Sequence, residues 1–195
     1  MKTYKINEIF YTLQGEGFYT GTPSLFIRFS GCNLQCPFCD TSHQSFHETT
    51  LDEIIQIATQ SPIRHVVLTG GEPALQIDEP LTTALHHAHK FIAIETNGTT
   101  PIQGNVDWIT LSPKTTWSPR PLVIRNCNEL KVVFTNKDQD FSQYLNLTCQ
   151  IRYLQPCDTH DKIQNKRILQ EVIKYCLENP QWNLSLQTHK LIGIR

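Results

Sequence analysis

Three cysteines, Cys32, Cys36 and Cys39, lie close together in a CxxxCxxC spacing. The apolar segment over residues 24–29 precedes them and is typical of a β-strand, so the thiols are expected on a tight loop at the end of a strand. A four-iron, four-sulfur cluster normally binds one thiolate at each iron. Three thiolates leave one iron without a protein ligand, and that iron can bind a substrate or a cofactor. The spacing therefore predicts a cluster that takes part in chemistry as well as in electron transfer.

A zinc site is the main alternative for these thiols. Structural zinc takes four ligands, and either His43 or His47 would complete a Cys3His set. The protein would then be a zinc-stabilised interaction domain without enzymatic activity. A chance grouping of three core cysteines is disfavoured because they are so close in the sequence.

Two glycine-containing segments and one arginine are further candidates for a site. Thr69-Gly70-Gly71-Glu72-Pro73 ends an apolar run over residues 65–69, and glycines at a strand end let the backbone approach a ligand closely. The loop over residues 13–17, Leu-Gln-Gly-Glu-Gly, is either a simple turn or a similar binding loop. Arg28 lies in the strand over residues 24–29 and either faces solvent or binds an anion. A guanidinium suits a carboxylate because it can donate two parallel hydrogen bonds.

Strands and helices are expected to alternate along the chain. A helix over residues 51–59 starts with a capping signature, in which Thr50 is followed three residues later by Glu53. Other helices are predicted over residues 78–90, 137–147 and 162–178. Strands are predicted over residues 6–12, 24–29, 65–69, 91–95, 106–111, 129–134, 150–154 and 183–188.

This alternation implies a parallel sheet, whose ligand sites lie at the carboxyl ends of the strands. Polar residues follow the predicted strands at that end, and they are expected to meet at one mouth. They are Cys32, Thr69, Glu95, Ser112 and Gln155.

The expected fold class is α/β, an incomplete TIM-like barrel with reduced outer helices. No convincing helix follows the strands that end near Glu95 and Leu111. The chain has 195 residues, which is short of the roughly 250 residues of a closed eightfold barrel. We therefore predict a partial barrel of about six βα units, in a single domain over residues 1–195.

Composition excludes several classes of function. With 17 basic and 18 acidic residues, the net charge of −1 offers no large basic field for nucleic acid. No apolar run reaches membrane-spanning length, and the N-terminus lacks the apolar core of a signal peptide, so a cytoplasmic protein without membrane contact is expected. An odd number of cysteines, seven in all, fits a metal site in a reducing compartment better than a disulfide framework.

The motifs together resemble those of the radical S-adenosylmethionine (SAM) enzymes and, among these, the 7-carboxy-7-deazaguanine synthase family. The superfamily pattern is CxxxCxxC with an aromatic residue, here Phe38, before the last cysteine, and a later Gly-Gly-Glu-Pro segment. The resemblance covers nearly the whole chain. Its other matching segments are residues 13–17, 28–29, 32–41, 95–98, 112–114, 155–156 and 187–190.

The resemblance implies a lyase of queuosine (7-deazapurine) biosynthesis. The family converts 6-carboxy-5,6,7,8-tetrahydropterin to 7-carboxy-7-deazaguanine with loss of ammonia. One electron, expected from a flavodoxin, cleaves SAM to methionine and a 5′-deoxyadenosyl radical, which takes a hydrogen from the pterin carbon that bears the carboxylate. SAM is regenerated, Mg²⁺ is a further cofactor, and a homodimer is expected.

The resemblance also implies a role for individual residues. Cys32, Cys36 and Cys39 would hold the [4Fe–4S] cluster. Thr41 would bind Mg²⁺, and Asp40 competes for that role because its charge makes it the better ligand. The substrate-binding residues would be Leu13, Gln14, Gly15, Glu16, Arg28 and Thr69, with Glu16 at the guanidine-like edge of the pterin and Arg28 at its carboxylate. The SAM-binding residues would be Phe38, Cys39, Asp40, Gly71, Ser112, Pro113, Lys114, Gln155 and Asp158.

A second radical SAM function is an activase that forms a glycyl radical on a partner protein. Such an enzyme shares the cysteines and the Gly-Gly-Glu-Pro segment, so these do not discriminate. The loop over residues 13–17 and Arg28 favour a small carboxylated substrate instead.

Overall fold

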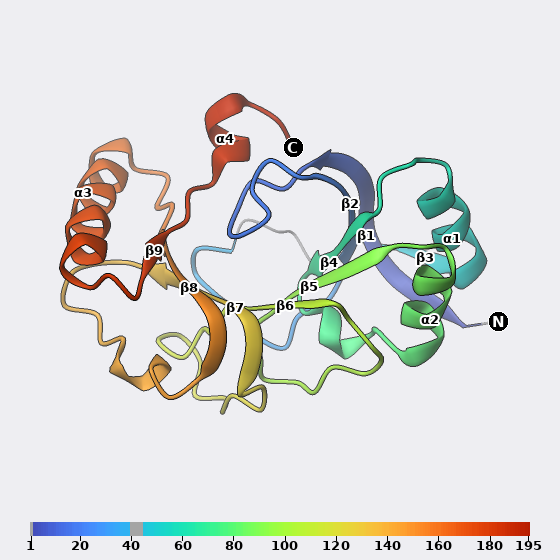
Figure 1. Cartoon of the computed structure of the whole chain (residues 1–195), viewed down its shortest axis with the longest axis horizontal. Helices are drawn as coiled ribbons and strands as arrows, with labels where there is room; N and C mark the ends of the chain where they lie inside the picture. Colours follow the sequence, from blue (N-terminus) through green and yellow to red (C-terminus); the bar gives the residue numbers. More distant parts are fainter. Residues whose placement is uncertain (1, 40–44) are drawn as a thin grey trace.

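The computed structural model describes residues 2–39 and 45–195. Within them, one nine-stranded sheet has the strand order β3-β1-β2-β4-β5-β6-β7-β8-β9. Figure 1 shows this sheet curving into an arc, with α1 and α2 outside one end and α3 outside the other. The strands are β1 (Thr3–Leu13), β2 (Pro23–Phe29), β3 (His47–Thr50), β4 (His65–Gly70), β5 (Phe91–Thr96), β6 (Trp108–Leu111), β7 (Asn126–Phe134), β8 (Thr148–Pro156) and β9 (Asn183–Leu184).

The sheet is an open, partial barrel, as predicted. Each neighbouring pair from β2 through β9 is parallel. β1 pairs antiparallel with β2 and with β3, so β3 and β9 are the two edges of the sheet. The short strand β3 was not predicted, because its sequence of His-Glu-Thr-Thr has no apolar alternation.

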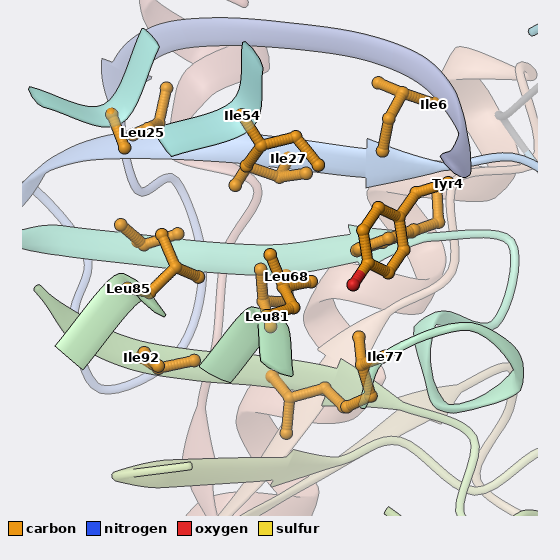
Figure 2. Close-up of a cluster of buried hydrophobic side chains, with 14 residues drawn as sticks. Tyr4, Ile6, Leu25, Ile27, Ile54, Leu68, Ile77, Leu81, Leu85 and Ile92 are labelled. Carbon is orange, nitrogen blue, oxygen red and sulfur yellow. The ribbon is translucent and has the colours of Figure 1, made fainter. Parts of the chain in front are cut away.

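The hydrophobic core lies between the outer face of the sheet and the helices α1 (Leu51–Thr59), α2 (Glu79–His87) and α3 (Lys162–Glu178). Figure 2 shows Ile27 and Leu68 from the strands packed with Ile54 of α1 and Leu81 and Leu85 of α2. A second cluster packs β7 and β8 against α3. Side chains alternate along each strand, so the residues between these apolar positions face the inside of the barrel. They include Arg28, Thr69, Glu95, Lys131 and Gln155.

Two predicted elements differ from the structure. The helix over residues 137–147 is reduced to a short 3₁₀ turn, η2 (Ser142–Tyr144). Asn136 Oδ1 accepts from the backbone N–H of Asp138, and Asp140 Oδ1 accepts from that of Ser142, which are turns that compete with a helix. The strand over residues 183–188 ends at Leu184, and a short helix, α4 (Thr188–Ile192), follows.

Other predictions were confirmed. α1 carries the predicted capping box, in which the Thr50 side chain accepts from the backbone N–H of Glu53 and the Glu53 side chain accepts from that of Thr50. α3 spans the predicted residues 162–178. Residues 97–107 and 112–125, which follow β5 and β6, contain no helix.

In the described part of the chain no helix is both long and apolar enough to cross a lipid bilayer.

Aromatic side chains from the β1–β2 loop close the amino end of the barrel. Phe18 stacks on Trp108 at 4.9 Å between ring centroids. Tyr19 contacts His65 at 4.6 Å and Trp108 at 4.9 Å. The interior is therefore filled at this end, which leaves the carboxyl ends of the strands for a ligand.

Candidate active site

A cavity of about 740 Å³ opens at the carboxyl ends of the strands. It is lined by the three clustered cysteines and by nearly all the residues that the sequence predicted for substrate and SAM. These are Leu13, Gln14, Gly15, Glu16, Arg28, Cys32, Cys36, Phe38, Cys39, Thr69, Gly71, Ser112, Lys114, Gln155 and Asp158. Pro113 is buried and does not line the cavity. Asp40 and Thr41 lie outside the described residues.

The cysteine loop presents soft sulfur donors to this cavity. Its thiols belong to a tight turn, in which the backbone N–H of Cys39 donates to the Cys36 carbonyl at 3.1 Å. None of the seven cysteines of the chain, all of which lie in described segments, forms a disulfide. Burial raises the pKa of the Cys36 thiol, and the nearby Lys114 ammonium acts in the opposite direction. Three thiols beside a cation fit an iron–sulfur cluster, which binds its ligands as thiolates.

The geometry does not favour the zinc alternative. No three His, Cys, Asp or Glu side chains in residues 2–39 and 45–195 are grouped closely enough to hold one metal ion. His47 is an exposed residue of β3, and His43 lies outside the described residues. In an iron–sulfur cluster the three thiolates bind three different irons, so they stand farther apart than three ligands of one ion.

Gly70, the last residue of β4, and Gly71 after it are packed against the end of β2 and the start of the cysteine loop. Gly70 has a φ of +126°, and a Cβ there would lie 2.1 Å from the Phe29 carbonyl oxygen. A Cβ on Gly71 would lie 2.0 Å from the Gly31 carbonyl oxygen and 3.0 Å from the backbone nitrogen of Cys32. The sequence predicted a close approach to a ligand, and the structure shows a close approach to the backbone that carries the first cysteine.

Glu72, in the segment after β4, connects the cysteine loop to the end of β5. The sequence did not reveal this role. Its fully buried carboxylate accepts from Thr96 Oγ1 at 2.6 Å and from the backbone N–H of Asn97 at 2.7 Å. Asn97 in turn donates to Asn33 Oδ1, next to Cys32. Burial raises the pKa of Glu72, although these hydrogen bonds oppose the shift. Three segments distant in sequence are thereby held in one arrangement.

Arg28 faces the cavity rather than bulk solvent. Its Nε donates to Glu8 Oε1 at 2.9 Å. The same carboxylate also accepts from the guanidinium of Arg195. Both guanidinium groups lie over the ring of Phe10, at 5.8 Å for Arg28 and 4.9 Å for Arg195. This wall of the cavity therefore carries two guanidinium groups, which suit an anionic ligand.

Charged residues also occur at the inner wall of the barrel, around Lys131. Lys131 Nζ donates to Glu16 Oε2 at 2.6 Å and to Glu95 Oε1 at 3.3 Å. Glu95 further accepts from Gln14 Nε2 at 3.2 Å and from Thr69 Oγ1 at 3.1 Å. Burial would raise the pKa of Glu16, but the Lys131 ammonium outweighs it and holds that pKa well below its usual range.

Glu95 was predicted to lie at the mouth of the site but without a specific role, and Lys131 was not predicted as a site residue. One signal for Lys131 was its place between the apolar residues Leu130 and Val132, where a charge must find a partner.

Several of the predicted SAM-binding residues form polar contacts of their own at the cavity. Lys114 Nζ donates to the carbonyl and the hydroxyl of Ser112, at 2.9 and 2.5 Å. Gln155 Oε1 accepts from Ser185 at 2.9 Å. Asp158 accepts from Lys190 of α4 at 2.8 Å, and this hydrogen bond holds the pKa of Asp158 well below its ordinary value.

α4 lies across the edge of the site. The Thr188 hydroxyl and backbone N–H both donate to the Gly15 carbonyl at 2.9 Å. Gln187 donates to Glu16 Oε1 at 2.8 Å. Figure 1 shows α4 beside the β1–β2 loop, although their residues are far apart in sequence. The turn of the chain after β9 therefore supplies part of the site.

Comparison with known proteins gives a consistent result. Residues 26–128 match the model of the radical SAM superfamily. The chain is 49% identical over 191 residues to 7-carboxy-7-deazaguanine synthase of Bacteroides thetaiotaomicron, covering 98% of each sequence. It is 41% identical to the enzyme of that name from Burkholderia multivorans, covering 98% of this chain and 99% of the relative. It also resembles the crystal structure of QueE from Escherichia coli, with a TM-score of 0.77, 27% identity and coverage of 96% and 95%.

These relationships decide between the possible families. The relatives share the full length of the chain and one name, which favours the synthase over the activase. Membership of the radical SAM superfamily implies a [4Fe–4S] cluster and SAM as cofactors, in agreement with the donors at the cavity. The chain belongs to the 7-carboxy-7-deazaguanine synthase family of radical SAM enzymes.

Proposed function

We propose that this cavity binds 6-carboxy-5,6,7,8-tetrahydropterin and converts it to 7-carboxy-7-deazaguanine with loss of ammonia. The observation that carries the proposal is that three thiols, a cationic wall and a wall of carboxylates line one cavity. The name shared by relatives up to 49% identical supports the same reaction.

Cys32, Cys36 and Cys39 are the proposed ligands of the cluster. With SAM bound, the cluster supplies the one-electron chemistry that starts a radical reaction on the substrate. Lys114 contributes a positive charge near Cys36, which favours the thiolate form of that residue. Gly71 lets the segment after β4 pack against the cysteine loop, so that both can face one ligand.

The substrate is proposed to lie between the two charged walls. Arg28 would bind its carboxylate, because the planar fork of a guanidinium suits a carboxylate. Glu16 would accept hydrogen bonds from the guanidine-like edge of the pterin. Leu13, Gln14 and Gly15 would contact the ring, and Thr69 would contact it from β4. The distribution of charge in the cavity supports this orientation, because Arg28 lies on β2 whereas Glu16 lies in the β1–β2 loop, beside Lys131 of β7.

SAM is proposed to occupy the side of the cavity nearest the cysteines. Its contacts would come from residues at the ends of β4, β6 and β8 and from the cysteine loop. They are Phe38, Cys39, Asp40, Gly71, Ser112, Lys114, Gln155 and Asp158, whereas Pro113 does not line the cavity and is not proposed to touch SAM.

Magnesium is a further proposed cofactor, with Thr41 as its protein ligand. Mg²⁺ prefers oxygen ligands and takes few of them from the protein, so one hydroxyl and the substrate carboxylate would form a sufficient site. Asp40 is the competing ligand because it carries a charge. We also propose a flavodoxin as reductant, a homodimer, and a single catalytic domain over residues 1–195.

An anaerobic assay tests the reaction. The reconstituted protein is mixed with SAM, a chemical reductant, magnesium and the carboxylated pterin, and the product is followed by mass. Product should form with the native chain and disappear in Cys36→Ala. A protein that cleaves SAM but leaves the pterin unchanged would contradict the proposed substrate.

The role of Arg28 can be tested separately by binding. Arg28→Met should weaken binding of a pterin that carries a 6-carboxylate and leave binding of the same ring without the carboxylate nearly unchanged. Arg167→Met is the matched control, because Arg167 is an exposed residue of α3. Equal weakening for both pterins would contradict a contact between Arg28 and the carboxylate.

A further inference from the structure

We infer that Lys131 is a positioning residue, which keeps Glu16 and Glu95 together as hydrogen-bond acceptors for the donor edge of the pterin. This inference rests on the function proposed above. It adds a residue for which neither the motifs nor the family resemblance provided a role.

Lys131 is placed for this task by the register of β7. Its neighbours Leu130 and Val132 are buried in the core under α3, so its own side chain points into the barrel. The side chain is 6% exposed. A lysine buried to this extent must be paired, because an isolated buried charge costs far more than a buried ion pair.

Its ammonium joins carboxylates from two distant segments. Glu16 belongs to the β1–β2 loop, and Glu95 lies near the end of β5. The Nζ–Oε distances are 2.6 and 3.3 Å, so both carboxylates lie within hydrogen-bonding reach of one cation. Without that cation, the two negative charges would repel each other in a buried site, and one of them would take up a proton.

Other polar groups around this pair do not replace the cation. Gln14 and Thr69 donate to Glu95, and Gln187 donates to Glu16, but all three are neutral. The remaining charged groups that act on the triad are Glu129 on β7 and Lys114 after β6, and His65 on β4 interacts with Glu95. Glu129 adds negative charge, and burial lowers the pKa of Lys114. Lys131 is therefore the cation that directly balances Glu16 and Glu95.

The charge state of this pair affects recognition of the substrate. A 2-amino-4-oxopyrimidine edge presents adjacent N–H donors, which match ionised carboxylates because these only accept. A protonated carboxyl donates through its O–H and so opposes one of the substrate donors. Lys131 would thus maintain the acceptor pattern without touching the substrate.

Binding titrations over a range of pH test the inference. The holoenzyme, reconstituted with cluster and SAM, is titrated with fluorescent pterin-6-carboxylate between about pH 6 and about pH 8. The native chain should bind with nearly constant affinity. Lys131→Met should bind more weakly at low pH and recover as the pH rises, by up to roughly tenfold per pH unit, because the shared proton must leave before the donor edge can bind. Lys131→Arg should keep the flat profile of the native chain.

Controls separate this role from a structural one. Lys174→Met, on the exposed face of α3, should match the native profile. If Lys131→Met does not fold, Lys131→Gln provides the same test, since it keeps a donor without the charge. A loss of affinity in these variants that is equal at every pH would overturn the positioning role alone. Failure of the native chain to bind either a carboxylated or an uncarboxylated pterin would overturn the proposed function as well.

Discussion

The backbone of Gly71 lies directly against the carbonyl group of Gly31, with no room for a side chain between them. The backbone N–H of Glu72 donates to that same Gly31 carbonyl at 2.9 Å. The segment after β4 and the cysteine loop after β2 are therefore one packed unit, although they lie far apart in sequence. This contact lies next to Cys32, the first cysteine of the loop.

Gly71→Ala should impair cluster binding more than overall folding. The new Cβ would lie 2.0 Å from the Gly31 oxygen, so the backbone next to Cys32 must move. Iron and sulfide content after anaerobic reconstitution should fall clearly, and cleavage of SAM should fall with it. Gly21→Ala is the control, because a Cβ there meets open space. Its φ of +87° adds a backbone strain that Gly71→Ala does not have, so cluster content should still fall more in Gly71→Ala. Native cluster content in Gly71→Ala would mean that the contact is not required.

Glu72→Gln should change how stability depends on pH. Burial raises the pKa of Glu72 above its ordinary value of 4.5. At a pH between 4.5 and the raised pKa, the native chain therefore holds more protons than the unfolded chain. The free energy of unfolding of the native sequence should therefore fall as pH rises through this window. Urea unfolding at about pH 5 and about pH 7 should show a smaller fall in Glu72→Gln. An equal fall in both proteins would assign the effect to another group, such as Glu129, whose pKa is also raised.

Lys190→Met should remove a small stabilisation that depends on pH in the opposite sense. The hydrogen bond from Lys190 depresses the pKa of Asp158, so the contribution to stability is present above the ordinary pKa of 3.8 and disappears as pH falls through the depressed value. Near neutral pH the loss should be no more than about 1 kcal/mol, because both side chains are partly exposed. Thermal unfolding should show a difference between the two proteins at neutral pH that shrinks in strong acid. A difference that grows on acidification would contradict this assignment.

Leu81→Ala should reduce stability and leave the site intact. Leu81 is completely buried in the cluster between α2 and the outer face of the sheet, away from the cavity. Removing such a side chain typically costs about 2–5 kcal/mol. Chemical denaturation should show this loss, while cluster content of the folded protein stays at the native level. Reduced cluster content in fully folded Leu81→Ala would mean that the outer core and the cysteine loop are coupled.

Local features of the fold could be predicted from the sequence because they depend on residues close together in the chain. The parallel strands β2 and β4–β8 follow from apolar runs, and the start of α1 follows from Thr50 and Glu53, three residues apart. The cysteine spacing is likewise a property of a few adjacent residues. The helix over residues 137–147 was wrong, because its apolar positions gave no indication that Asp140 would cap a turn instead.

Contacts between distant segments were decided only in the tertiary structure. The alternation of side chains along β2 left open whether Arg28 faced solvent, and the curvature of the sheet places it in the cavity. Lys131 and Glu16 are 115 residues apart and meet because β7 and the β1–β2 loop converge inside the barrel. Neither residue carries a local signal of its partner, since the energy of a buried ion pair depends on distance and burial in space rather than on spacing in the chain.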